Sequence, residues 1–377
     1  MTYKRAFNFF LFSGIGAILP LIGVYLKNDL NFSGTSIGLI VSTSPLFSFF
    51  AQIITGYLTD KTRLIRALIS IFTTILLISL ILLYKIRDFY IFFIVYGIYS
   101  LSSSSLILLN NIGIIEDESI QKFGKIRVFG SIGFLITAGI TPFIIKEKRD
   151  LIFLLSIVSS LILIFFISAY PKRKKTHRKP KIKIKDIIIP GFWAVIGVTF
   201  LFQISYACLD TFLGILINKS GYSDYWIGIA WVIGVLSELP VMYFTEKIIK
   251  KIGVFNFILL GIIAGFIRWT GYYLTSSITV IILLQILHSF TFSALYNGGI
   301  YLSYKFFPEK LISVGQSLYD SFSRILGYFV GIITIGFIYE NKGIKAVFLF
   351  SSIMAFVSLI LFLSLKTFLN RQNLSKT

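Results

Sequence analysis

The stretch Pro171-Lys-Arg-Lys-Lys-Thr-His-Arg-Lys-Pro-Lys-Ile-Lys-Ile-Lys185 lies near the middle of the chain, and nine of its fifteen residues are Lys or Arg. A segment with this charge neither enters a bilayer nor folds alone. Long apolar runs lie on both sides of it. Because short cytoplasmic loops carry an excess of Lys and Arg, the stretch predicts an inner linker between two hydrophobic halves. Binding to anionic lipid headgroups is compatible with this role. Nucleic-acid binding is not expected, since no folded soluble domain presents the basic run.

The composition is that of a polytopic membrane protein. Of 377 residues, 56% are hydrophobic and only 14% are charged, whereas a soluble domain carries about 25% charged residues. The net charge of +20 is expected to gather in loops on one side of the membrane. The one cysteine, Cys208, excludes an internal disulfide and a Cys-rich metal site. We expect no cofactor, no metal and no soluble catalytic domain.

Apolar spans of about 20 residues, each long enough to cross a bilayer, recur along the chain. The predicted spans are 6–26, 35–58, 65–84, 89–112, 126–145, 150–170, 189–217, 225–244, 252–274, 277–304, 312–338 and 344–367. The predicted fold is therefore an all-α polytopic membrane protein of twelve transmembrane helices in two pseudo-symmetric six-helix bundles. The predicted domains are the first bundle at 1–170, the basic linker at 171–188 and the second bundle at 189–377.

The loop charges predict the orientation. With the N-terminus inside, 25 of the 36 Lys and Arg residues fall in inner segments and 9 in outer loops. This asymmetry predicts that both termini are cytoplasmic. The expected location is the cell membrane, with the lipid bilayer as a partner.

The two halves repeat short patterns at matching places. Phe32-Ser33-x-x-x-Ile37-Gly38 opens the second span, and Tyr222-Ser223-x-x-x-Ile227-Gly228 opens the eighth. The second span ends in Tyr57-Leu58-Thr59-Asp60-Lys61, and the eighth ends in Tyr243-Phe244-Thr245-Glu246-Lys247. Parallel six-helix repeats mark a large class of secondary transporters whose substrate site lies between the halves near the midplane.

Further motifs point to a known family. Gly56-Tyr-Leu-Thr-Asp60-Lys61-Thr-Arg63 resembles the Gly-x-Leu-x-Asp-Arg-x-Gly-Arg loop motif of the major facilitator superfamily, although Thr62 or Arg63 replaces the second Gly. Four stretches are similar to the lactose-permease-like branch, which includes phenylpropionate permeases and nucleoside:proton symporters. They are Gly124-Lys-Ile-Arg127-Val-Phe-Gly130-Ser-Ile-Gly133, Gly265-Phe-Ile-Arg268-Trp, Leu287-His288-Ser-Phe-Thr291-Phe and Gly315-Gln316-Ser-Leu-Tyr319. The resemblance covers nearly the whole chain.

The resemblance implies roles for several residues. Lactose permeases use an acid on helix 8, an Arg on helix 9 and a His on helix 10 to couple sugar and proton movement, and Glu238, Arg268 and His288 occupy the corresponding helices. Their proton-carrying Glu, one turn after that His, is replaced here by Thr291. The loop motif implies that Asp60, with Lys61 and Arg63, holds the cytoplasmic side shut in one state.

Ionisable residues inside apolar spans indicate the site independently of the family. A charge at the centre of a membrane helix costs roughly 2.5–3.5 kcal/mol, so such residues face a partner or a water-filled path. Six lie well inside predicted spans, away from the span ends, and all are in the second half: Asp210, Glu238, Arg268, His288, Asp320 and Arg324. The alternative is a set of static ion pairs that join helices.

The pairing of these residues is left open by the sequence. Asp320 and Arg324 are four residues apart, so they share a helix face and are placed to pair. Arg268 either pairs with Glu238 or binds a substrate carboxylate. With three acids against two arginines, one carboxylate lacks a fixed partner and is suited to carry a proton. Glu238 and Asp210 are the candidates, and His288 is another titratable group.

Polar stripes on the helices extend this predicted path. Gln203, Tyr206 and Asp210 follow at spacings of three and four on the seventh span, which predicts one helix face. Pro20, Pro45, Pro142 and Pro240 lie inside spans, where they permit bends.

The predicted function is secondary active transport of a small organic solute, coupled to protons by symport and carried out by a functional monomer. An aromatic carboxylate, a nucleoside and a sugar are the competing substrates. No Gly-x4-Gly-Lys-Ser/Thr motif for ATP is present. Proton-driven efflux of small organic compounds is the alternative. A membrane receptor without transport activity and an intramembrane enzyme are remote alternatives.

Overall fold

The computed structural model describes residues 2–118, 120–146, 148–172 and 184–374, and every regular element in these ranges is helical. Ten segments are long and apolar enough to cross a membrane. The last of them, Ile312–Thr367, is interrupted at Gly343, where φ is 80° and ψ is −179°. One shorter apolar helix, Leu151–Phe166, adds a further segment. The described residues therefore contain twelve apolar segments, and the predicted all-α polytopic fold is confirmed.

The chain divides into two compact units. Unit 1 comprises Met1–His177 together with Asp210–Val232, and unit 2 comprises Arg178–Leu209 together with Ile233–Thr377. Unit 1 therefore includes one segment of the second half of the chain, Asp210–Val232. The predicted domain boundary at the basic linker stays a prediction, and residues 173–183 of that linker lie outside the described residues.

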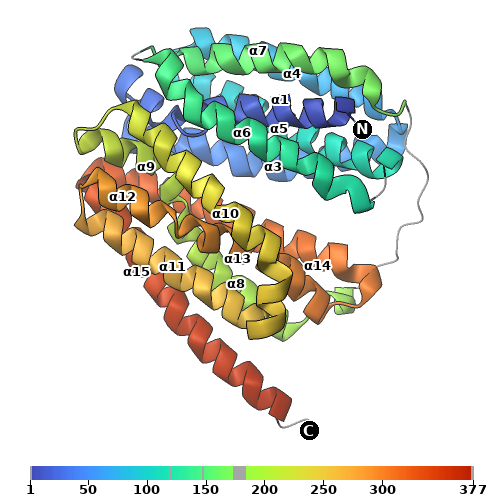
Figure 1. Cartoon of the computed structure of the whole chain (residues 1–377), viewed down its shortest axis with the longest axis vertical. Coiled ribbons are helices and arrows are strands. Elements are labelled where there is room, and N and C mark those ends of the chain that lie inside the picture. The colour runs from blue at the N-terminus through green and yellow to red at the C-terminus, as the bar shows by residue number, and fades with distance from the viewer. Residues whose placement is uncertain (1, 119, 147, 173–183, 375–377) are drawn as a thin grey trace. The chain divides into compact units, whose positions relative to one another are not determined.

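The elements of the first half follow the predicted spans. They are α1 (Thr2–Ile18), α2 (Ile22–Val24), η1 (Tyr25–Asp29), α3 (Gly34–Thr62), α4 (Ile65–Lys85), α5 (Phe89–Glu118), α6 (Ile120–Ile145), α7 (Leu151–Phe166) and η2 (Ile167–Ala169). Helix α1 packs against α6 and α7, and α5 packs against α3 and α4 (Figure 1). A Cβ on Gly133 would lie 2.2 Å from the Phe9 carbonyl oxygen, so the absence of a side chain lets α6 approach α1 closely.

The ends of α3 show how the repeated motif is built. Ser33 caps the first turn, because its hydroxyl accepts a hydrogen bond from the Ser36 N–H at 3.2 Å. Arg63 ends the helix in the left-handed region, with a φ of 61°. Glycine is the usual residue at such a helix end. Arg63 therefore occupies the position where the superfamily motif has its second Gly.

An ion-pair cluster ties Asp210–Val232 into unit 1. Arg149 lies between α6 and α7, and its Nε donates to the Asp224 carboxylate at 2.6 Å. Its Nη1 lies 3.2 Å from Asp29, and Asn218 donates to Asp224 at 3.0 Å. Burial lowers the pKa of the Arg149 guanidinium, but the Asp224 and Asp29 carboxylates outweigh that effect, so the pKa is raised.

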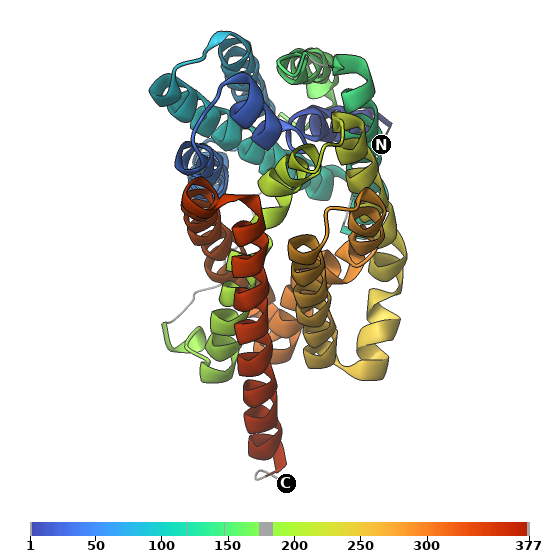
Figure 2. The same ribbon diagram turned by 90° about the vertical axis from the view of Figure 1, so that its left-hand side faces the viewer.

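The second half contains η3 (Ile184–Asp186), α8 (Pro190–Tyr206), α9 (Cys208–Lys219), α10 (Asp224–Ile252), α11 (Val254–Leu274), α12 (Ile278–Gln285), α13 (His288–Phe306), η4 (Glu309–Leu311), α14 (Ile312–Tyr319), η5 (Asp320–Ile325) and α15 (Leu326–Leu374). In unit 2, α15 packs against α8 and α11, and α13 packs against α11. The arm of α15 after Gly343 runs to the C-terminal end of the chain (Figure 2).

Several predicted spans are broken in the middle. The first breaks at Leu19–Leu21 around Pro20, and the seventh breaks at Ala207 between α8 and α9. In the seventh, the Ser205 hydroxyl donates to the Phe202 carbonyl at 2.6 Å. Such back-bonding often bends a helix. The tenth span breaks at Ile286–Leu287, so that α13 begins at His288. Pro45, Pro142 and Pro240 stay inside helices.

Candidate functional site

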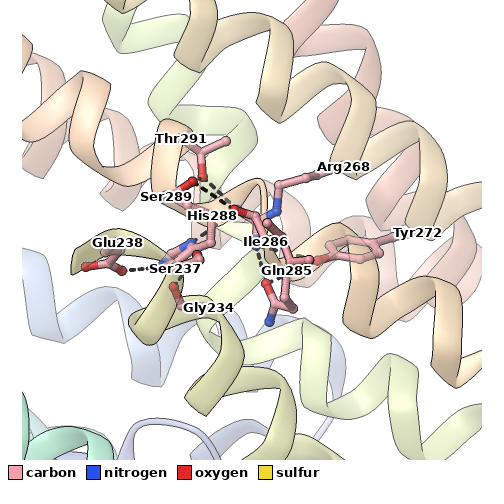
Figure 3. A network of polar contacts seen from close by, with 10 residues as sticks. All are labelled: Gly234, Ser237, Glu238, Arg268, Tyr272, Gln285, Ile286, His288, Ser289 and Thr291. Atoms are coloured by element: carbon pink, nitrogen blue, oxygen red, sulfur yellow. Dashed lines mark hydrogen bonds and ion pairs between the residues drawn. The ribbon is translucent and has the colours of Figure 1, made fainter. Parts of the chain in front are cut away.

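Three helices of unit 2 bring the predicted acid, arginine and histidine together (Figure 3). Glu238 lies on α10, Arg268 on α11, and His288 is the first residue of α13. Gly234 faces the imidazole from the turn before Glu238, and a Cβ there would lie 3.3 Å from the ring. A glycine at this position gives the histidine room to reach α10.

Glu238 pairs with His288. The Oε1 atom of Glu238 lies 2.7 Å from Nε2 of His288, and both side chains are buried. Neither Lys nor Arg lies within 4.0 Å of this carboxylate among the described residues. The histidine is therefore the titratable neighbour of Glu238.

Arg268 is fully buried and surrounded by neutral groups. Nη1 donates to the Thr291 hydroxyl at 2.7 Å and lies 3.2 Å from Nδ1 of His288. Nη2 donates to Gln285 and lies 3.5 Å from the Tyr272 hydroxyl. The guanidinium carbon also lies 4.9 Å from the Trp269 ring centroid. In the described part of the chain, no carboxylate approaches this guanidinium within 4.0 Å. Of the two alternatives that the sequence left open for Arg268, a direct pair with Glu238 is not formed among the described residues, and binding of a substrate carboxylate stays a prediction.

The partners of the two ring nitrogens favour one tautomer of a neutral His288. Guanidinium N–H groups only donate, so Nδ1 of His288 accepts from Arg268. A neutral imidazole carries its hydrogen on the other nitrogen, so Nε2 donates to Glu238. The negative carboxylate and the positive guanidinium thus balance each other through a neutral ring.

Asp320 and Arg324 form a second charged pair in unit 2. Nη1 of Arg324 donates to Oδ1 of Asp320 at 2.9 Å, which is the pairing that their four-residue spacing allows. Both residues lie on η5, a π-helical turn between α14 and α15. Such turns occur often at functional sites. The two side chains are 27% and 32% exposed for Arg324 and Asp320.

Aromatic rings lie between the two charged groups along α13. His288, Phe292 and Tyr296 are four residues apart and share a face. The His288 and Phe292 ring centroids are 5.9 Å apart, and those of Phe292 and Tyr296 are 5.7 Å apart with planes 6° from parallel. The Arg324 guanidinium carbon lies 5.0 Å from the Tyr296 ring centroid.

The predicted polar stripe of the seventh span is only partly continuous. Tyr206 contacts the imidazole of His288, with ring centroids 6.3 Å apart. Gln203 is buried one turn earlier on α8, and its Oε1 accepts no hydrogen bond from any described residue. Asp210 lies beyond the break at Ala207, in the first turn of α9, and belongs to unit 1. The structure therefore places Tyr206 beside His288 in unit 2, and the predicted path role of Asp210 stays a prediction.

The predicted gate residues lie at the end of α3. Asp60 and Lys61 belong to its last turn, and Arg63 follows it. The Lys61 ammonium lies 5.6 Å from the Tyr57 ring centroid, and Lys61 and Arg63 are both exposed.

The sequence reasoning missed four neutral members of the cluster. Gln285, Tyr272 and Thr291 hydrogen-bond Arg268, and Trp269 stacks near it. Tyr272 is four residues after Arg268, and Gln285 is three before His288, so helical spacing from the charged residues is the signal that would have found them. The described residues contain no group of three or more His, Cys, Asp or Glu side chains that could hold a metal ion.

Comparison with known proteins gives the family. The model of the MFS_1 like family matches residues 2–350. An uncharacterized transporter, YwbF of Bacillus subtilis, is 26% identical, with 93% of this chain and 90% of that protein covered. Maltose permease of Geobacillus stearothermophilus is 24% identical, covering 94% and 92%. A probable 3-phenylpropionic acid transporter of Escherichia coli is 23% identical, covering 89% and 90%. A crystal structure of a mutant of the nucleoside transporter NupG superposes with a TM-score of 0.87 at 18% identity, covering 97% of this chain and 99% of that one.

Proposed function

This chain belongs to the MFS_1-like family of membrane transporters, and from that membership we propose that it is a proton-coupled symporter of a small organic solute. The family makes it a multi-pass transporter rather than an enzyme. The competing substrate classes are an aromatic carboxylate, a sugar and a nucleoside. The first two match the names of two relatives, and the third matches the name of a protein of the same fold.

The observation that carries this proposal is the chain of contacts from Glu238 through His288 to Arg268. In the described state, the carboxylate and the guanidinium cancel across the neutral ring. A proton added to Glu238 or His288 leaves the buried Arg268 without a balancing charge. An uncompensated buried charge costs several kcal/mol. Proton binding is therefore favourable only when another change in the site, such as the binding of solute, offsets this cost. Coupling of proton movement to solute movement requires such a dependence.

The wider arrangement follows the same proposal. The two six-helix halves, divided at the basic linker 171–188, alternate the access of the site between the two faces of the membrane. Asp60, Lys61 and Arg63 form the cytoplasmic gate. Asp210, Gln203 and Tyr206 line the path, and the active form is a monomer in the cell membrane.

We propose that both termini are cytoplasmic, on the basis of the loop charges. Cysteine labelling tests this orientation, because the one native cysteine, Cys208, is buried. In intact cells carrying a Cys208→Ala background, an impermeant maleimide should label Arg87→Cys and spare Thr62→Cys. The reverse pattern would invert the topology.

Uptake by proteoliposomes under an imposed inward proton gradient tests the function. We would compare 3-phenylpropionate, maltose and uridine for the wild type, for Glu238→Gln and for Glu309→Gln, which alters an exposed carboxylate. One solute should accumulate in the wild type and in Glu309→Gln. Glu238→Gln should lose accumulation at least tenfold while exchange of preloaded solute continues, because a neutral side chain no longer carries the proton.

Accumulation that survives in Glu238→Gln would place the proton site elsewhere. If the wild type accumulates none of the three solutes but drives one outward, the protein is an exporter and the symport proposal fails.

A further inference from the structure

Arg324 presents an unused edge of its guanidinium. Its Nη1 is bonded to Asp320, but Nε and Nη2 donate to no described residue. A guanidinium offers five N–H donors in a planar fork that matches a carboxylate. The Arg324 side chain is 27% exposed in a segment that spans the membrane. Because a charge exposed to lipid is costly, this exposed part faces water rather than hydrocarbon.

Arg268 lacks these properties. Its side chain has no exposed surface, and its two terminal nitrogens already contact Thr291, His288, Gln285 and Tyr272. A ligand that reached it would have to displace these partners. Nε of Arg268 also lacks a hydrogen-bond partner, but it is buried. Of the two arginines, Arg324 is the one whose unpaired donors belong to a partly exposed side chain.

A flat apolar surface lies beside the guanidinium of Arg324. Tyr296 is 38% exposed, and its ring packs against the Arg324 guanidinium. The row of rings extends from Tyr296 through Phe292 to His288. Eight residues of α-helix separate His288 from Tyr296, which is about 12 Å. That length accommodates one aromatic ring with a short side chain. Aromatic rings favour offset or edge contacts with other rings.

Charge balance indicates the sign of the ligand. In the described membrane segments of unit 2, Glu238 is balanced by Arg268, and Asp320 is balanced by Arg324. Loading one proton adds one positive charge to this set. A monocarboxylate restores the balance, whereas a neutral nucleoside or sugar does not.

We propose that the substrate is an aromatic monocarboxylate whose ring packs on Phe292 and Tyr296 and whose carboxylate binds the Nε and Nη2 edge of Arg324. This inference rests on the proposed function and narrows its substrate class. Asp320 is a positioning residue here, because its bond to Nη1 fixes the guanidinium and leaves the Nε and Nη2 edge without a partner among the described residues.

Equilibrium binding to the purified full-length protein tests the assignment without transport. The probes are 3-phenylpropionate and its neutral amide, 3-phenylpropanamide, which share the ring and the side chain. The wild type should bind the acid at least tenfold more tightly than the amide, since a hydrogen bond to a charged group contributes about 1.5–3 kcal/mol.

Two arginine variants separate the candidates. Arg324→Gln should weaken acid binding at least tenfold and remove the preference for the acid over the amide. Arg268→Gln should keep that preference. Tyr296→Leu should weaken both probes by a similar factor, because it removes the ring surface and leaves the charge. Arg324→Lys, which keeps the charge but not the fork, should recover part of the preference, and elution as a single species shows that each variant is folded.

Three results would overturn the assignment: no binding of either probe to the wild type, an acid preference retained in Arg324→Gln, or an acid preference lost in Arg268→Gln alone. None of these results bears on proton coupling. The Glu238→Gln variant tests that coupling with the solute that the wild type accumulates. Conversely, tight binding of the acid together with unchanged accumulation in Glu238→Gln would place the proton site elsewhere and would still support the binding site at Arg324.

Discussion

Arg268 is a buried cation whose nearest acid reaches it only through an imidazole. Its neighbours Gln285, Tyr272 and Thr291 are neutral, so its main electrostatic interaction is with the Glu238–His288 pair. In this arrangement the arginine is a positioning residue. It holds Nδ1 of His288 as an acceptor and thereby keeps Nε2–H directed at the carboxylate.

Arg268→Gln should uncouple transport from protons. Without the guanidinium, the negative charge of the Glu238–His288 pair is uncompensated, so the pair should take up a proton and keep it throughout the cycle. Gradient-driven accumulation should fall at least tenfold while exchange of preloaded solute continues, measured in proteoliposomes. Arg268→Lys keeps the charge and should retain part of the accumulation. Normal accumulation in Arg268→Gln would contradict the role given to this charge.

The sequence identified the charged members of the site but not how they are connected. Glu238, Arg268 and His288 were found because ionisable groups are rare in apolar spans. Their order of contact depends on Gly234, which makes room for the imidazole, and on the break before His288. Neither feature alters hydropathy. Gln285 and Tyr272 were missed because uncharged polar residues are common in membrane helices as hydrogen-bonding partners.

At the scale of the elements, hydropathy predicted the spans well and their irregularities poorly. All twelve apolar segments lie where runs of apolar residues predict them, because span length is determined by bilayer thickness. The break at Ala207 and the π-helical turn at Asp320–Ile325 arise from local hydrogen bonding that hydropathy does not register. The predicted face shared by Gln203, Tyr206 and Asp210 is therefore interrupted before Asp210.

Close helix approach in unit 2 depends on Gly331 of α15. A Cβ at this position would lie 2.5 Å from the Ile204 carbonyl oxygen and 2.8 Å from its Cα. Because the obstacle is backbone, Gly331→Ala should destabilise the protein by about 1–3 kcal/mol and lower its thermal unfolding midpoint in detergent. Gly197→Ala on α8 is the matched control, since a Cβ there meets nothing within 4 Å. It should gain helix propensity and raise the midpoint slightly. Equal shifts in both variants would show that the helices do not meet at Gly331.

At the scale of the whole molecule, we expect the gate proposed at the end of α3 to control how often the two halves exchange states. Asp60→Asn should reduce the uptake rate several-fold in proteoliposomes and leave the Kd for substrate unchanged within about twofold, because Asp60 is not among the residues proposed to touch it. Glu309→Gln serves as the control for loss of an exposed inner carboxylate. A Kd that rises in step with the loss of uptake would place Asp60 in the binding machinery instead.

The balanced pairs of unit 2 have an electrical consequence. If the cargo is a monocarboxylate and one proton accompanies it, each cycle moves no net charge across the membrane. A membrane voltage, which contributes about 2.3 kcal/mol per charge for each 100 mV, then adds nothing to accumulation. Only the acidity difference drives it, at about 1.4 kcal/mol, or tenfold in concentration, for each pH unit. Such a carrier continues to fill a cell whose voltage has collapsed and stops when the two sides reach the same acidity.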